Sequence, residues 1–166
     1  MTEETPEEIV RAFERTDGIE LEKRTFRVTT TAFESTVEIE DGEGKPTYVV
    51  TVMVPTLDAA TAGEVGPTVA RDWRETLERR LAEAPKATRA TVELDGLKIE
   101  EKGDELEIQF AYGASNPRRG ADIAKTFVEY VEGTYVEGII PGYEYTSPVD
   151  SLLSDASQSG ESGTPL

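Results

Sequence analysis

The sequence predicts an α+β domain: a mainly antiparallel sheet of about five strands, in the order α-β-β-β-α-β-β-α, with helices packed on one side of the sheet. Three observations support this prediction: two periodic patterns of apolar residues and the short length of the connections between strands. Apolar residues alternate with polar ones within residues 26–54 and 92–112, as in strands. They recur every three or four positions before, between and after these stretches, as in amphipathic helices. Short connections join most of the strands, which favours antiparallel pairing.

The first predicted helix begins near Thr5 and ends at Gly18. Its start resembles a capping box, with Thr5 as N-cap, Pro6 at the first helical position and Glu8 three residues after Thr5. Gly18 suits the left-handed conformation that often ends a helix. The apolar face consists of Ile9, Val10 and Phe13.

Three strands are predicted after this helix. Apolar residues occupy even positions up to Val28 and odd positions from Phe33, so we expect a turn or bulge within residues 29–32. Residues 41–44, Asp-Gly-Glu-Gly, match a hairpin turn. Residues 48–54 are apolar or β-branched at almost every position, so this strand is expected to be central and covered on both faces.

The second half of the domain is predicted to be a helix, two strands and another helix. The helix spans residues 66–84, and Trp73 lies in its core stripe; stacking of Trp73 on a ligand is the alternative interpretation. A change of parity at residues 95–96 predicts a bulge in the following strand. The last helix is expected to start at residues 115–117 and to end at Gly133.

Residues 134–145, which we call the C-terminal strap, are too apolar for a free linker and too rich in glycine for a helix. We expect the strap to cover either its own sheet or the sheet of a second subunit, because exposed apolar patches are rare on soluble monomers. The alternative is that Tyr135 and Tyr143 form the rim of a ligand site. Residues 1–156 are predicted to form one domain, and the small polar residues 157–166 a disordered tail.

Charge is the most informative feature of the composition. The chain has 34 acidic and 17 basic residues, a net charge of −17, spread along its whole length. At molar salt the Debye length falls to about 3 Å, so self-repulsion disappears while the carboxylates keep the protein hydrated. We therefore predict a cytoplasmic protein of a halophilic organism, with an acidic mesophilic protein as the alternative. Nucleic acid and anionic membranes are not expected as partners, and no apolar stretch is long enough to span a bilayer.

The chemical inventory argues against catalysis. The chain has no cysteine and no histidine, which excludes disulfides, thiolate nucleophiles, Cys-ligated metals and imidazole bases. The phosphate-binding patterns GxxxxGK[ST] and GxGxxG are absent. With 34 carboxylates, some must lie close together by chance, so no pair of Asp or Glu residues can be identified as a catalytic acid and base from the sequence. No catalytic residue, metal or cofactor is predicted.

An anion site is the one ligand site that the sequence suggests. Arg118 and Arg119 lie at a predicted helix start, where the helix dipole favours negative charge. They would hold an anion together with the first-turn amides and Ser115 or Asn116. In the alternative interpretation, both arginines pair with neighbouring carboxylates. With Tyr135 and Tyr143 from the strap, these are the predicted ligand-binding residues.

Three segments, residues 54–57, 73–80 and 130–145, resemble an uncharacterised haloarchaeal family across residues 6–156. The element order is similar to that of type III secretion chaperones. Neither resemblance implies an activity, because fold does not fix function. We predict a non-catalytic module that binds a protein or a ligand, as a homodimer or with a protein partner. The alternative is a small-molecule sensor or enzyme that uses arginine, tyrosine and carboxylate side chains.

Overall fold

The computed structural model describes residues 6–22, 25–40, 44–89 and 91–155. Within this part of the chain, six strands form one sheet in the order β1-β2-β3-β4-β6-β5, and every neighbouring pair is antiparallel. The elements are α1 (Glu7–Glu14), β1 (Ile19–Glu22), β2 (Thr25–Val28), β3 (Glu34–Glu40), β4 (Thr47–Pro55), α2 (Leu57–Ala60), α3 (Pro67–Leu81), the 3-10 helix η1 (Ala84–Ala87), β5 (Leu94–Lys102), β6 (Glu105–Gly113) and α4 (Pro117–Glu137).

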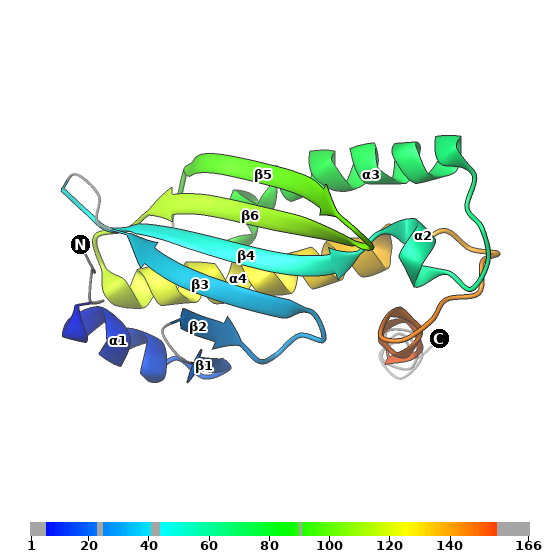
Figure 1. The fold of residues 1–166 in the computed structure, drawn as a ribbon. Helices are drawn as coiled ribbons and strands as arrows, with labels where there is room; N and C mark the ends of the chain where they lie inside the picture. Colours follow the sequence, from blue (N-terminus) through cyan, green and yellow to red (C-terminus); the bar gives the residue numbers. More distant parts are fainter. Residues whose placement is uncertain (1–5, 23–24, 41–43, 90, 156–166) are drawn as a thin grey trace, which may run out of the picture.

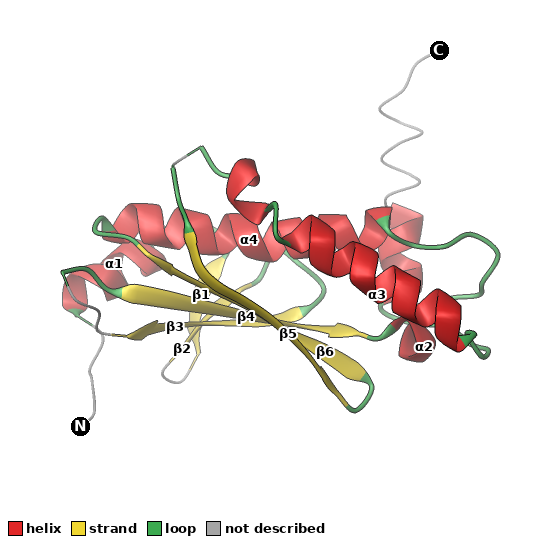
Figure 2. Cartoon of the chain, turned by 90° about the horizontal axis from the view of Figure 1, so that it is seen from above, coloured by secondary structure: helices red, strands yellow, loops and turns green. Residues whose placement is uncertain are grey.

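One face of the sheet carries the core. Helix α4 lies along this face, and α1, α3 and η1 pack against α4 (Figures 1 and 2). Alternate residues of β4 are fully buried beneath α4, and the residues between them are half-buried on the opposite face. The prediction of helices on one side is confirmed. The prediction that β4 is covered on both faces is wrong, because its β-branched residues pack against neighbouring strands instead of a second layer.

The turn and bulge predictions are confirmed. Strand β2 ends at Val28 and β3 begins at Glu34, and in the turn between them the hydroxyl of Thr31 donates to the carbonyl of Phe33 (3.2 Å). The register of β5 against β6 shifts between Leu94 and Gly96. Such a shift turns the strand so that apolar side chains on either side of it face the core.

Besides the short 3-10 helix η1, two elements were absent from the prediction. Strand β1 pairs with β2 over its full length, but of its side chains only Ile19 is buried, and Leu21 is 48% exposed. Its sequence, Ile-Glu-Leu-Glu, does alternate apolar and polar residues, but over only four positions, so the signal was present and was overlooked. The other is the four-residue helix α2, too short to show a helical period; Thr56 caps it by accepting a hydrogen bond from the amide of Ala59 (3.2 Å).

The predicted end of the last helix is wrong. Helix α4 continues through the exposed Gly133 to Glu137, and the amide of Gly138 donates to the carbonyl of Thr134 (3.0 Å). The helix continues because Thr134 and Tyr135 are buried on its core face. Burial of this last turn outweighs the modest helix-destabilising effect of one glycine. The first residues of the C-terminal strap are thus helical.

The rest of the chain, residues 138–155, packs against the same protomer. The amide of Ala62 donates to the carbonyl of Glu144, and the amide of Thr146 donates to the carbonyl of Ala60, both at 2.8 Å. Residues 149–155 are helical, and Val149 is fully buried. This segment therefore covers the α2 end of the molecule, not the open face of the sheet.

Some predictions concern residues outside the described part of the chain. These are the N-cap Thr5, most of the turn at residues 41–44, and the tail at residues 157–166. Among the described helices, none combines the length and the apolar character needed to cross a bilayer.

Candidate functional site

A cavity of about 610 Å³ lies where the first half of α4 meets the segment after η1. Four cationic side chains line it, and we call it the basic groove: Arg89, Arg118, Arg119 and Lys125. The lining also includes Asp122 and Glu129, so the basic groove carries two more positive than negative side chains (four cations less two carboxylates).

Local sequence places these side chains. Asn116 is the N-cap of α4, and its Oδ1 accepts hydrogen bonds from the amides of Arg118 (2.9 Å) and Arg119 (3.2 Å). Pro117 occupies the first helical position, where its missing N–H is harmless. Lys125 follows Arg118 by seven residues, which is two helical turns, so both lie on the same side of α4. Packing of η1 on α4 brings Arg89 to the other wall.

The opposite side of α4 is held rigidly in the core. Gly120 lies against the ring of Tyr48, so close that a Cβ atom would come within 2.5 Å of the ring carbon Cζ. The hydroxyl of Tyr112 donates to the carbonyl of Gly120 (2.8 Å). Burial raises the pKa of Tyr112, so this phenol stays protonated as a donor. The start of α4 is therefore fixed, and with it the backbone that carries Arg118 and Arg119.

None of the four cations forms an ion pair with a carboxylate in the described part of the chain. Elsewhere such pairs are common; Arg74, for example, reaches both Glu78 (3.0 Å) and Glu101 (3.6 Å). Of the two carboxylates in the basic groove, Glu129 accepts a hydrogen bond from the hydroxyl of Thr30 (2.7 Å). Unpaired cations gathered in one place are unexpected in a chain with twice as many acidic as basic residues.

A second, smaller cavity of about 350 Å³ adjoins the basic groove. It lies between α1 and the start of α4, and Arg118 borders both cavities. Arg11 and Arg15 of α1 also line this second cavity. Arg11 pairs with Glu7 (2.6 Å), whereas Arg15 has no ion-pair partner among the described residues. Positive charge therefore extends from the basic groove towards α1.

The structure brings together only part of the predicted site. Asn116, Arg118 and Arg119 all line the basic groove, while Ser115 is exposed beside it. Tyr135 lies in the core near the other end of α4, where its hydroxyl donates to the carbonyl of Pro55 (2.9 Å) and burial raises its pKa. Tyr143 is half-buried in the segment after α4. The two tyrosines therefore do not belong to the basic groove.

Two of the four cations of the basic groove were missed from the sequence. Lys125 could have been found by its two-turn spacing from Arg118. Arg89 gives no such signal, because its position depends on how η1 packs against α4.

The cations of the basic groove are suited to holding an anion. Guanidinium groups keep their protons at any physiological pH, so they hold anions but do not act as bases. In the described part of the chain, no three acidic side chains gather closely enough to hold a metal ion.

Comparison with known proteins gives one match. Residues 8–155 match a family described as a family of unknown function, DUF5813, so the chain belongs to that family. No curated protein and no solved structure matches the chain.

Proposed function

We propose that this member of the DUF5813 family is a non-catalytic binding module that holds a small anion in the basic groove. The observation that carries this proposal is the set of four cations without ion-pair partners among the described residues, in a chain of net charge −17. Side chains that could have paired with abundant carboxylates instead face a shared cavity. An anionic ligand would supply the missing partners.

The ligand is a small molecule with several phosphate or carboxylate oxygens. The cavity of about 610 Å³ falls within the usual range for small-molecule sites, roughly 300–1,000 Å³. Arginine binds planar groups of oxygens through paired hydrogen bonds, and two arginines on one helix turn match a ligand with more than one such group. Because Asn116 already occupies the amides of Arg118 and Arg119, side chains and not the helix backbone make the contacts.

The overall charge determines which anions can approach. A net charge of −17 repels nucleic acid over long distances, so a long polyanion is a poor ligand even if its phosphates fit the basic groove. A small anion meets less of this repulsion, and at molar salt only contacts within about 3 Å matter. We further propose a cytoplasmic, halophilic setting, because acidic residues are spread along the whole chain and molar salt would screen their repulsion.

The salt requirement can be tested on the purified protein. Thermal unfolding followed by circular dichroism should give a higher melting temperature at molar KCl than at low KCl, because salt screens the self-repulsion. Equal melting temperatures would contradict the halophilic setting without affecting the anion site.

Isothermal titration calorimetry at constant ionic strength tests the anion site. Inorganic phosphate, pyrophosphate and citrate serve as probes, and the R118Q/R119Q variant removes two of the four cations. Its affinity for the best probe should fall by more than about tenfold, the loss expected for one charge-assisted hydrogen bond. R71Q/R79Q is the matched control, because it also removes two cations, and both arginines are exposed on α3 and line neither cavity at the start of α4.

Two results would overturn the proposal. The first is that none of the three probes gives saturable heat with the unaltered protein. The second is that R71Q/R79Q weakens binding as much as R118Q/R119Q, because the effect would then come from net charge and not from the basic groove.

A further inference from the structure

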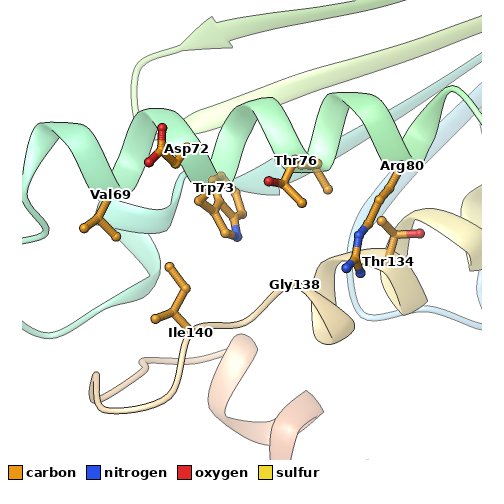
Figure 3. Close-up of a pocket in the computed structure, with 9 residues that line it drawn as sticks. Val69, Asp72, Trp73, Thr76, Arg80, Thr134, Gly138 and Ile140 are labelled. Atoms are coloured by element: carbon orange, nitrogen blue, oxygen red, sulfur yellow. The ribbon is translucent and has the colours of Figure 1, made fainter.

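A separate cavity of about 270 Å³ lies at the other end of α4 (Figure 3). It is enclosed by α3, by the last turn of α4 and by the segment that follows α4. We call it the Trp73 pocket. Its lining residues are Val69, Asp72, Trp73, Thr76, Leu77, Arg80, Thr134, Gly138 and Ile140. It shares no residue with the basic groove.

Trp73 places an unpaired donor in this pocket. Its side chain is only 6% exposed, and the ring of Tyr135 packs edge-on against it at 5.5 Å. The indole Nε1 faces the space beside Gly138 (Figure 3), and no described residue accepts a hydrogen bond from it. The indole N–H can only donate, and because Nε1 itself is accessible from the cavity, it is available to an acceptor there. The open space of the Trp73 pocket lies in front of this N–H, where an acceptor on a ligand would bind.

Gly138 keeps this space open. A Cβ atom on Gly138 would lie 3.9 Å from Nε1 of Trp73 and 3.4 Å from the carbonyl oxygen of Thr134. Both distances are ordinary van der Waals contacts, and the φ of −87° at Gly138 suits any residue. A methyl group would therefore be tolerated by the backbone but would fill the place in front of the indole N–H.

Arg80 adds a positive charge at the same side of the pocket. Its guanidinium points from α3 towards Thr134 and Gly138 (Figure 3), and it has no ion-pair partner among the described residues. Together with the indole N–H it can hold one carboxylate. Among the described residues, Asp72 is the only carboxylate that lines the pocket, and it lies two helical turns before Arg80, about 12 Å along α3. A second negative group on the ligand would meet Asp72.

The remaining walls are apolar. Val69, Leu77 and Ile140 line the pocket with the ring of Trp73, so the body of a ligand would lie against hydrocarbon. Burial of an apolar chain in such a site supplies affinity, and the few polar groups fix its orientation.

We propose that the Trp73 pocket binds a small monocarboxylic acid with an apolar chain. The carboxylate accepts a hydrogen bond from Nε1 of Trp73 and pairs with the guanidinium of Arg80. The chain lies between Val69, Leu77 and Ile140, and Asp72 disfavours dicarboxylic acids. This site is distinct from the basic groove, and neither proposal depends on the other.

The single tryptophan of the chain makes the test direct, because all indole fluorescence comes from Trp73. The full-length protein is titrated with hexanoate, its neutral analogue hexanamide, and adipate, which carries a second carboxylate. Hexanoate should change the fluorescence saturably and should bind more tightly than the other two. Calorimetry with the same probes confirms that the fluorescence change reports binding.

Two variants identify the contacts. Arg80→Gln should weaken hexanoate by about tenfold or more and leave hexanamide nearly unchanged, because only the carboxylate pairs with the guanidinium. Gly138→Ala should weaken both, because its methyl group blocks the approach to Nε1. Arg79→Gln, one residue earlier on α3 and outside the pocket, should bind hexanoate like the unaltered protein.

Circular dichroism and melting show that each variant is folded before binding is compared. Three results would each overturn the proposal: hexanoate gives no saturable change with the unaltered protein, folded Gly138→Ala binds hexanoate unchanged, or Arg79→Gln weakens hexanoate as much as Arg80→Gln does.

Discussion

Gly133→Ala should stabilise the protein, although Gly133 is where the sequence alone ends the last helix. In the structure Gly133 is an exposed position inside α4, it has no positive φ, and an added Cβ would meet no atom within 4 Å. Glycine inside a helix is less favourable than alanine by about 0.8–1.0 kcal/mol. The free energy of unfolding should therefore rise by up to about 1 kcal/mol.

Gly120→Ala on the same helix should do the opposite. The new Cβ would lie 2.5 Å from Cζ and 2.8 Å from the hydroxyl oxygen of Tyr48. The ring of Tyr48 is stacked between Phe13 (5.9 Å) and Tyr112 (5.4 Å), so it has no free space to move into. Overpacking of this kind costs about 1–3 kcal/mol, which outweighs the helix gain of about 1 kcal/mol. We expect a net loss of up to about 2 kcal/mol.

Urea denaturation of both variants and the unaltered protein, at one salt concentration, measures these differences. Both variants carry the same Gly-to-Ala change on the same helix, so each serves as the control for the other. If Gly133→Ala destabilises, the helix ends at Gly133 with a left-handed residue and the length of α4 is wrong. If Gly120→Ala stabilises as much as Gly133→Ala, the close packing of α4 on Tyr48 is wrong.

Three further predictions follow from burial. Tyr48→Phe should raise the free energy of unfolding by about 1 kcal/mol, because the buried hydroxyl has no hydrogen-bond partner among the described residues. The same urea assay measures this change, and a clear loss of stability would show that the hydroxyl is hydrogen-bonded. Burial raises the pKa of Tyr48 to about 12 and the pKa values of Tyr112 and Tyr135 above the usual 10.0. Stability should therefore be constant up to about pH 10 and then fall by up to about 1.4 kcal/mol per pH unit for each tyrosine, because only the unfolded chain loses these protons. Melting temperatures measured across this pH range test the prediction, and a melting temperature that does not fall above about pH 10 would contradict it. Ending the chain after Gly138 removes the fully buried Val149 and its partly buried neighbours, so it should cost at least about 3 kcal/mol, whereas ending it after Asp155 should leave melting nearly unchanged. Light scattering of both truncated chains at high salt, with their melting curves, would show whether the segment instead serves a dimer.

The sequence predicted the elements whose local pattern matches their burial. The alternation in β6 corresponds to a strand with one buried face, and the shift of parity at Gly96 corresponds to the bulge in β5. The sequence pattern predicts an element wrongly where tertiary contacts, and not local sequence, determine its burial or its end. Val49 and Thr51 of β4 suggest a second covered face, but they are half-buried by adjacent strands. Gly133 suggests a helix end, but the buried turn after it extends the helix.

The candidate sites show the same limit. Arg118 and Arg119 could be singled out because cations are unusual in the first turn of a helix. Arg89 could not, since its place in the basic groove depends on the packing of η1. For Trp73 the helical period correctly predicted a core residue, and the side chain is indeed buried. The direction of its indole N–H, which creates the second site, depends on a cavity that only the folded chain contains.

Helix α4 explains why one small domain can hold two sites without conflict. Its 21 residues span about 32 Å, with the basic groove beside its first half and the Trp73 pocket at its last turn. Along its length the helix is fixed against the sheet by buried residues such as Phe127 and Val131. The two cavities approach within five residues on α4, from Glu129 to Thr134, but they share no lining residue, so we expect their effects on stability and binding to be nearly additive. A ligand in one pocket therefore leaves the affinity of the other unchanged unless α4 itself moves, and the packing of Gly120 against Tyr48 opposes such movement.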